Sequence, residues 1–286
     1  MNTQKKKLIP FIALLPVLIA LIIWVIWGNT ALELNTYTIT SSRLPESFDG
    51  YRIAHVSDLH NAQMGAKNKK LLAMLREAKP DIIAITGDLI DSRNTNIDIA
   101  LQFVQESTKI APCYYVTGNH EARVDEFNEL KNGLLSAGVI VLEGTSAEIC
   151  IAGEYITLVG VNDPSFETDY LLGDSETVMQ SALSDLLTGS DGFTILLSHR
   201  PELLDTYLDC KVDLVLSGHA HGGQFRIPFF GGIIAPNQGF FPEFDAGIYT
   251  TGNTNMLVSR GIGNSIIPFR VNNRPEVILI ELTSNK

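Results

Sequence analysis

Side chains that commonly bind metal ions stand directly after five short apolar runs of this 286-residue chain. Five of the six histidines occupy such positions, whereas His55 lies inside a run and is expected to be a packed core residue. Imidazole, carboxylate and amide ligands together suit first-row metal ions such as Mn, Fe and Zn. The side chains at these positions are Asp58, His60, Asp88, Asp91, Asn119, His120, His199, His219 and His221.

The five runs are expected to be strands, and the run at 81–86 is nearly continuous in apolar residues, as is typical of a sheet covered on both faces. Helix-like segments alternate with several of them; in the segment 67–79, Leu71, Leu72 and Leu75 share one face. Because ligands bind beyond the carboxyl ends of strands in such sheets, the pattern predicts an α/β fold with the site at one edge. The runs lie at 52–57, 81–86, 113–117, 193–198 and 212–217, further strands are expected at 139–142, 147–152, 155–161, 255–259 and 277–282, and further helices at 95–108, 124–137 and 176–187.

The combination of these positions is more informative than any single motif. A lone D-x-H or G-D occurs often by chance, and a lone histidine is usually structural, but five such elements in this order are hard to explain by chance. Gly87, Gly118 and Gly218 each precede a predicted ligand, where the chain must turn and allow close approach. A carboxylate has two oxygens and can bridge two ions, which lie roughly 3.5–4 Å apart in two-metal sites.

The motifs resemble those of the calcineurin-like metallophosphoesterases, whose pattern runs D-x-H, G-D-x-x-D, G-N-H-[D/E], H and G-H-x-H. The tail, with GGQ at 222–224 and SRGIGNS at 259–265, resembles the membrane-associated bacterial phosphodiesterase branch. The resemblance implies an α/β, two-sheet sandwich flanked by helices. The chain has DLH at 58–60, GDLID at 87–91, GNHE at 118–121, SHR at 198–200 and GHAH at 218–221.

The resemblance also implies two divalent ions (Mn, Zn or Fe) and a hydroxide between them that attacks phosphorus in line. His120 would stabilise the transition state or protonate the leaving oxygen, and Asp91 would orient His120. The family usually has an arginine soon after that aspartate; here Ser92 intervenes, so no role is carried over to Arg93. One ion would be held by Asp58, His60 and His221, the other by Asn119, His199 and His219, and Asp88 would bridge both.

Residues 8–27 form an uncharged, almost wholly apolar stretch. At about 1.5 Å per residue a helix of this length spans roughly 30 Å, the thickness of a bilayer's hydrocarbon core. Lys5, Lys6 and Lys7 precede it, which predicts a cytoplasmic tail at 1–7 and an extracytoplasmic remainder at the cell membrane. The alternative is a cleaved signal peptide. The expected organisation is therefore this tail, a transmembrane anchor at 8–27, a connector at 28–50 and a metallophosphoesterase domain at 51–286.

The formal net charge of −11 argues against nucleic acid as a partner, because such proteins neutralise phosphates with basic residues. It leaves a phosphorylated substrate open, since bound metal ions dominate the local charge. The three cysteines, Cys113, Cys150 and Cys210, have no zinc-site spacing and are expected to be buried small hydrophobic residues.

The segment 227–244 contains five phenylalanines directly after the last histidine motif. One hypothesis is a flexible apolar rim that contacts a membrane or an acyl chain, and the other is two ordinary strands with a buried loop. The sequence predicts hydrolysis of a phosphodiester or pyrophosphate at the membrane surface, with an amphiphilic or lipid-linked substrate as the hypothesis. A phosphomonoesterase or phosphoprotein phosphatase, and a non-catalytic membrane-tethered scaffold, remain as alternatives.

Overall fold

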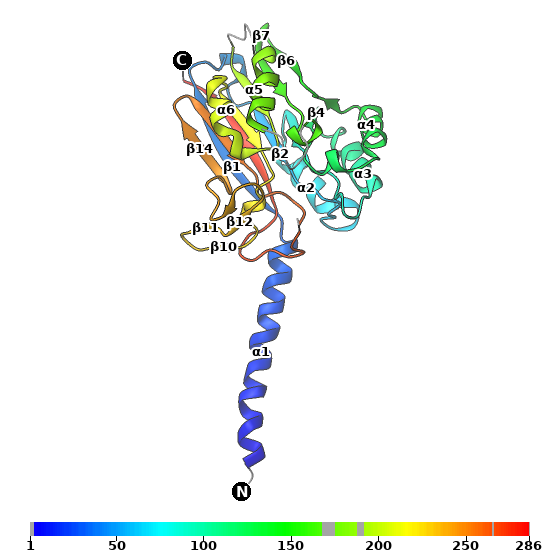
Figure 1. The fold of residues 1–286 in the computed structure, drawn as a ribbon, viewed down its shortest axis with the longest axis vertical. Helices are drawn as coiled ribbons and strands as arrows, with labels where there is room; N and C mark the ends of the chain where they lie inside the picture. Colours follow the sequence, from blue (N-terminus) through cyan, green and yellow to red (C-terminus); the bar gives the residue numbers. More distant parts are fainter. Residues whose placement is uncertain (1–2, 168–174, 188–191, 265, 286) are drawn as a thin grey trace.

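Two six-stranded sheets lie face to face and carry helices on their outer faces (Figure 1). The computed structural model describes residues 3–167, 175–187, 192–264 and 266–285, with side chains from residue 14 onward. The first sheet has the order β1 (Glu33–Ser41), β16 (Glu276–Ser284), β2 (Arg52–Val56), β3 (Ile82–Thr86), β4 (Cys113–Val116) and β5 (Ile140–Val141). The second has the order β14 (Gly247–Thr251), β15 (Thr254–Val258), β9 (Leu214–Ser217), β8 (Thr194–Leu197), β7 (Glu154–Gly160) and β6 (Thr145–Ile151).

The helices cover the outer faces of the two sheets. The apolar core therefore has three layers, one between the sheets and one between each sheet and its helices. Between the sheets, Ile53 and Ile82 belong to the same apolar cluster as Leu216. Outside them, Phe103 of α3 belongs to the cluster over the first sheet, and Leu183 of α5 to the cluster over the second. The predicted α/β fold with two sheets and flanking helices is confirmed. The helices are α2 (Lys69–Ala78), α3 (Ile97–Ser107), α4 (Phe127–Ser136), α5 (Ser175–Leu186) and α6 (Leu204–Asp209), and short 3-10 helices lie at Glu46–Phe48, Ala66–Asn68, Glu121–Arg123, Pro164–Phe166, Pro201–Leu203 and His221–Gly223.

Parallel pairing brings the functional ends of the strands to one edge. β2, β3 and β4 are mutually parallel neighbours in the first sheet, and β8 and β9 are parallel neighbours in the second. β3 lies against both β8 and β9 across the core. The carboxyl ends of these five strands therefore meet, as the sequence predicted.

The predicted connector at 28–50 is wrong for its central part, because residues 33–41 form β1. This strand pairs in parallel with β16 over its whole length, from Glu33 opposite Glu276 to Ser41 opposite Ser284. β1 is an edge strand whose side chains are mostly half-buried or exposed. An edge strand needs no continuous apolar run, so local composition carries no strong signal for it.

The N-terminal segment is a helix, α1 (Thr3–Thr30), that projects from the globular part (Figure 1). Its end is fixed by Asn29, whose amide side chain exchanges two hydrogen bonds with the backbone of Arg270, at 3.0 and 2.7 Å. Within the described part of the chain, no helix combines the length and apolar character needed to cross a membrane. The first part of the predicted anchor at 8–27 lies within residues 1–13, for which the structure describes no side chains.

Two smaller predictions are corrected. Cys113 is buried, but Cys150 is exposed because β6 is an edge strand of the second sheet. In the segment 227–244, the chain forms two small antiparallel hairpins, and Phe229, Phe230, Phe240 and Phe241 are exposed, which contradicts the buried-loop interpretation. The hairpin strands are β10 (Arg226–Ile227), β11 (Gly231–Gly232), β12 (Ile234–Ala235) and β13 (Gly239–Phe240).

Candidate metal centre

All seven predicted ligands lie at the shared edge of the two sheets, and all are buried. β2 leads to Asp58 and His60, β3 to Asp88, and β4 to Asn119. From the second sheet, β8 leads to His199, and β9 to His219 and His221. The sequence prediction thus named residues that the fold brings together from both sheets.

The first group of potential ligand atoms comes from Asp58, His60, Asp88 and His221, and these atoms lie within 4.8 Å of one another. Nε2 of His60 is 3.1 Å from Nε2 of His221 and 3.4 Å from Oδ2 of Asp88. Nε2 of His221 is 3.3 Å from Oδ1 of Asp58. Two imidazole nitrogens and two carboxylates that converge in this way form a donor set suited to a divalent cation.

The second group comes from Asp88, His199 and His219. Nε2 of His199 is 3.2 Å from Oδ2 of Asp88 and 3.2 Å from Nδ1 of His219. Asn119 lines the same pocket as Asp88 and His219, and its buried Oδ1 finds no hydrogen-bond partner among the described residues. An unpartnered buried oxygen is costly unless it has another ligand, so Asn119 fits a metal-binding role. Asp88 belongs to both groups.

Two histidine rings are oriented by hydrogen bonds on the side away from the cluster. Nδ1 of His199 donates to the carbonyl of Thr86 at 2.7 Å, so Nε2 is the nitrogen that faces the cluster. Nε2 of His219 lies 3.0 Å from Oδ1 of Asn237 and 3.2 Å from Nη1 of Arg200, so Nδ1 is the nitrogen that faces the cluster. Outer partners of this kind orient a metal-binding histidine ring. Sequence analysis missed Asn237, which lies in the segment 227–244 and has no motif of its own.

The titration of the cluster reflects concentrated negative charge. Burial opposes ionisation of Asp58, but the neighbouring His221 and His60 hold its pKa well below the usual range. Burial also opposes ionisation of Asp88, whose pKa is held low mainly by His199. Burial would lower the pKa of His199, but Asp88 raises it to about 10. Two ionised carboxylates in a buried cluster favour the binding of cations.

The backbone at the cluster is strained. Five of the seven predicted ligands have positive φ angles: Asp58 (53°), His60 (44°), Asp88 (51°), His219 (65°) and His221 (48°). Residues other than glycine rarely adopt this conformation, which costs on the order of 1–3 kcal/mol each and is concentrated at functional sites. The strained turns aim these side chains at one point.

His120 lies beside the first group, with its ring centroid 4.4 Å from that of His60. Its predicted partner Asp91 is 3.7 Å from Nδ1, beyond hydrogen-bond distance, and is instead paired with Arg93. The backbone N–H of Ser92 donates to Nδ1 of His120 at 3.0 Å. Because a backbone N–H can only donate, the neutral ring carries its proton on Nε2. Burial lowers the pKa of His120 to about 4, which keeps the ring neutral near pH 7.

Glu121 is a further residue of the site that the sequence did not single out, although it ends the GNHE motif. Its fully buried carboxylate accepts hydrogen bonds from the backbone N–H groups of Asp88 (2.9 Å), Gly118 (2.8 Å) and Ile90 (3.3 Å). It therefore ties the turn after β3 to the turn after β4.

A buried ion pair supports the turn after β8. Arg200 forms a bidentate pair with Asp163, with Nε–Oδ2 at 2.5 Å and Nη2–Oδ1 at 2.8 Å. Arg200 directly follows the predicted ligand His199, but its partner is 37 residues away, so no sequence pattern indicates the pair.

The cluster opens into a pocket of about 170 Å³. Arg93 and Arg123 line its mouth together with His120, which places positive charge where a phosphate group could enter. Pro236 and Ile266 form an apolar part of the same wall. The arrangement can hold metal ions at its base and an anionic ester above them.

Comparison with known proteins agrees with this geometry. Residues 51–223 match the family model described as calcineurin-like phosphoesterase. The chain is 32% identical over 88% of its length to the uncharacterized metallophosphoesterase YkuE of Bacillus subtilis, covering 86% of that protein. It is 29% identical over 81% of its length to the phosphodiesterase YaeI of Escherichia coli, covering 82% of it.

A third relative is the transmembrane protein with metallophosphoesterase domain of Danio rerio, 30% identical over 85% of this chain and 56% of its own length. Among solved structures, TT1561 of Thermus thermophilus shares the fold, with a TM-score of 0.51 at 16% identity, over 74% of this chain and 90% of that one. The extent of the family match and the identity to YkuE decide the classification. The chain belongs to the calcineurin-like phosphoesterase family, and it is a hydrolase of phosphoester bonds.

Proposed function

We propose that the protein hydrolyses a phosphodiester or a pyrophosphate with two divalent ions (Mn, Zn or Fe) at the carboxyl ends of β2, β3, β4, β8 and β9. The observation that carries this proposal is the position of Asp88, which belongs to two adjacent groups of potential ligands. Asp58, His60 and His221 would hold one ion, Asn119, His199 and His219 the other, and Asp88 both.

Bound ions would supply positive charge that neutralises the phosphoryl oxygens and lowers the pKa of the attacking water. The protein's own groups complete the reaction. His120, neutral and protonated on Nε2, would donate a hydrogen bond to a phosphoryl oxygen. Ser92 keeps that proton on Nε2 through its backbone N–H. Protonation of the leaving oxygen would require the imidazolium form of His120, which burial disfavours. Arg93 and Arg123 attract the anionic substrate to the mouth of the pocket.

The test is turnover by the full-length protein in detergent, stripped of metal and then refilled with Mn, Zn or Fe. Bis-(p-nitrophenyl) phosphate reports diester hydrolysis, and p-nitrophenyl phosphate reports monoester hydrolysis. We expect metal-dependent diester turnover that is lost in Asp88→Asn and His120→Ala and kept in Asp125→Asn, a matched change at an exposed loop position. Turnover of the monoester alone would favour a phosphomonoesterase or phosphoprotein phosphatase. No turnover by folded, metal-loaded protein would favour a scaffold.

We also infer that α1 anchors the protein in the cell membrane, with tail 1–7 in the cytoplasm, residues 8–27 in the bilayer and the catalytic domain on the extracytoplasmic face. Support comes from the apolar sequence at 8–27 and the lysines before it. The catalytic domain of this proposal includes β1, because that strand belongs to the first sheet. Alkaline carbonate extraction should leave the protein in the membrane pellet, whereas protein released as soluble material would contradict the anchor.

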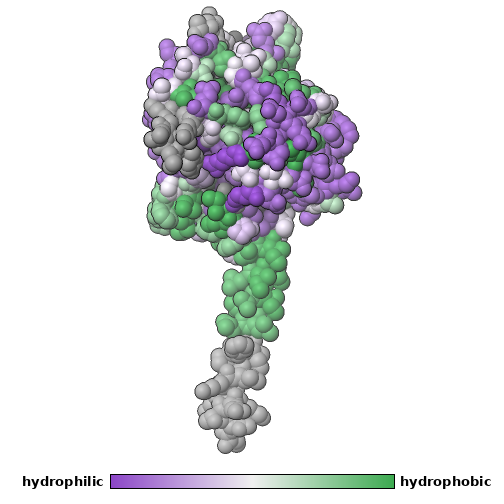
Figure 2. Space-filling view, turned by 45° about the vertical axis from the view of Figure 1, so that its right-hand side comes forward, coloured by the Kyte–Doolittle hydropathy of each residue, from purple (hydrophilic) through white to green (hydrophobic). Residues whose placement is uncertain are grey.

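An amphiphilic or lipid-linked substrate is the finer form of the proposal. β10, β11 and β12 lie at the end of the globular part from which α1 leaves (Figure 1), and Figure 2 shows an apolar area at this end. Phe229, Phe230, Phe240 and Phe241 of these hairpins are exposed. Ile266, which lines the metal pocket, is 79% exposed. A phosphate in the pocket could thus continue into an acyl chain on an apolar surface.

This substrate class predicts a selective effect of the phenylalanines. Phe240→Ser with Phe241→Ser should raise KM for a phospholipid diester in vesicles and leave kcat/KM for bis-(p-nitrophenyl) phosphate unchanged. Leu135→Ser, at an exposed position of α4, is the matched control. Equal losses on both substrates would contradict the idea, since they would indicate general damage to the fold.

A further inference from the structure

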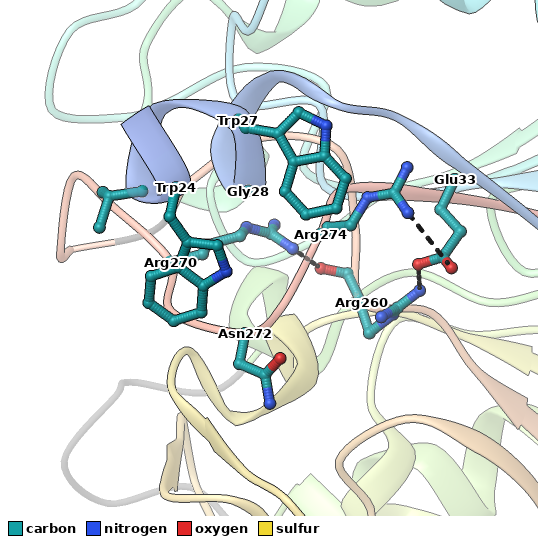
Figure 3. A pocket seen from close by; sticks show the side chains of 9 residues that line it. Trp24, Trp27, Gly28, Glu33, Arg260, Arg270, Asn272 and Arg274 are labelled. Carbon is teal, nitrogen blue, oxygen red and sulfur yellow. Dashed lines mark hydrogen bonds and ion pairs between the residues drawn. The ribbon is translucent and has the colours of Figure 1, made fainter. Parts of the chain in front are cut away.

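A second pocket, of about 230 Å³, lies between the end of α1 and the globular part (Figure 3). It shares no lining residue with the metal pocket. Its side chains come from α1, from the start of β1 and from the segment between β15 and β16. The lining includes Trp24, Trp27, Glu33, Arg260, Arg270, Asn272 and Arg274.

Three guanidinium groups line this pocket, and in the part of the chain that the structure describes only two carboxylates pair with them. Arg260 pairs with Glu33 at 2.9 Å and with Glu276 at 2.7 Å, and Arg274 lies 3.6 Å from Glu33. Arg270 has no carboxylate partner among the described residues. Its buried guanidinium donates to the carbonyl groups of Arg260 and Gly263 and to Oδ1 of Asn264, and its Nη2 lies 3.4 Å from Nδ1 of His221 in the metal centre. The three cations and two anions leave an excess of positive charge in a partly buried pocket, which favours an anionic ligand.

The pocket is held in shape by contacts to the helix end. Arg274 donates to the carbonyl groups of Ala31 (2.9 Å) and Leu32 (3.0 Å), and its guanidinium carbon lies 4.8 Å from the ring centroid of Trp27, a cation–π contact. The hydrogen bonds between Asn29 and the backbone of Arg270 fix the other side. A site built in this way requires little ordering when a ligand binds.

The two tryptophans indicate the environment in which a ligand of this pocket would bind. Trp24 and Trp27 are 42% and 51% exposed and lie at the end of the apolar helix. Tryptophan is enriched at this level of membrane proteins, where the ring meets the lipid headgroups. Arginine suits phosphate groups because its planar fork can bind two oxygens at once. The two tryptophans and the partly exposed guanidinium of Arg274 therefore face the region where lipid phosphates would lie.

We propose that this pocket binds a phosphate group, and that the ligand is the headgroup of an anionic phospholipid. The lipid as the source rests on the proposed membrane anchoring through α1, whereas the phosphate site itself does not depend on catalysis. A bound headgroup would fix the height and tilt of the globular part above the bilayer. The exposed phenylalanines of the neighbouring hairpins would then face the same lipid surface.

The chain's two tryptophans both line this pocket, so their fluorescence reports on it directly. Full-length protein in neutral detergent is titrated with short-chain phosphatidylglycerol, with short-chain phosphatidylcholine and with inorganic phosphate. We expect a saturable emission change with phosphatidylglycerol at about tenfold lower concentration than with phosphatidylcholine. Added salt should weaken it, because the attraction is electrostatic.

Asn272→Asp is the first test variant, since it adds a carboxylate to the pocket and removes none of the arginines. Asn272 has a φ of 53°, which aspartate tolerates well. We expect half-saturation to need about tenfold more phosphatidylglycerol, and Arg274→Gln to act in the same direction. The matched control is Asn253→Asp, an exposed position in a different pocket, near Ser41 at the far end of β1.

The outcomes are distinct. A saturable response to inorganic phosphate but none to phosphatidylglycerol would overturn the lipid assignment. No saturable response to either ligand, or equal effects of Asn272→Asp and Asn253→Asp, would overturn the site. Circular dichroism of each variant identifies misfolding. Since the readout needs no turnover, a failure of the proposed phosphodiesterase activity would leave this result unaffected.

Discussion

Replacing Glu121 by glutamine should weaken the link between two turns of the metal centre without removing any proposed ligand. The carboxylate uses Oε2 to accept from the backbone N–H groups of Asp88 (2.9 Å) and Gly118 (2.8 Å), and Oε1 to accept from Ile90 (3.3 Å). A glutamine side chain has only one acceptor oxygen. If that oxygen stays with Asp88 and Gly118, the amide NH2 group faces the N–H of Ile90, and one buried donor is left unsatisfied.

The expected loss of folding free energy follows from this one unsatisfied donor. One buried, unsatisfied N–H costs about 1–3 kcal/mol, and hydrogen bonds to a neutral acceptor are weaker than those to a carboxylate. We expect a loss of about 2 kcal/mol, a minority of the roughly 5–15 kcal/mol that stabilises a typical protein. Glu121→Gln should therefore still fold. A misplacement of about 1 Å in Asp88 or Asn119 would lower kcat/KM by up to roughly 100-fold.

Two measurements on full-length, metal-saturated protein check this. Thermal unfolding should shift down by roughly 4–8 °C, from about 2–4 °C per kcal/mol for a chain of this size. Turnover of bis-(p-nitrophenyl) phosphate should fall at least tenfold. Glu129→Gln, at an exposed position of α4, should change neither quantity. A Glu121→Gln protein with an unchanged unfolding temperature and turnover within twofold of wild type would refute the argument that Glu121 positions the two turns.

Three more predictions concern the same site. Refilling stripped protein with metal at about 100 times its dissociation constant should stabilise the fold by about 2.7 kcal/mol, and an unchanged unfolding temperature would exclude tight binding. Gly118→Ala should lower the amount of bound metal measured by elemental analysis, because the new methyl group would overlap the carboxylate shared by the two ligand groups; Gly192→Ala, whose new methyl group would lie 3.9 Å from its nearest neighbour, should bind metal normally. Asp91→Asn should lower kcat/KM less than tenfold, because the Ser92 backbone holds the His120 ring; a loss above about 100-fold would restore Asp91 as the orienting group.

Some features of the fold can be predicted from the sequence and others cannot, for physical reasons. β3 is buried at all five positions, so its residues are continuously apolar and mark both the strand and the ligand position that follows it. β1 lies at an edge with mostly half-buried side chains, so polar residues interrupt it and conceal the strand. Local composition reports burial on both faces, but it does not report pairing with a strand such as β16, more than two hundred residues away.

The same distinction separates the ligands from the groups that hold them. Residue type and strand position predicted Asp58 and His219 as ligands, because carboxylate and imidazole groups are among the few side chains that bind metal ions. The bidentate pair of Asp163 with Arg200 depends on how two distant turns meet, and no pattern in the sequence encodes that. The glycines indicated tight turns, but not that the predicted ligands themselves would have strained backbone angles.

The proposed ligands hold one another's turns in place. Oδ1 of Asp88 accepts from the backbone N–H of His120 at 2.8 Å, and the carboxylate of Asp58 accepts from the backbone N–H of His219 at 3.2 Å. Each aspartate thus stabilises a turn from another strand while its remaining electron pairs face the cluster. These cross-links offset part of the strain of the positive φ angles. Substituting either aspartate should consequently disturb two turns at once, and the loss of metal binding should exceed that from substituting a single histidine ligand.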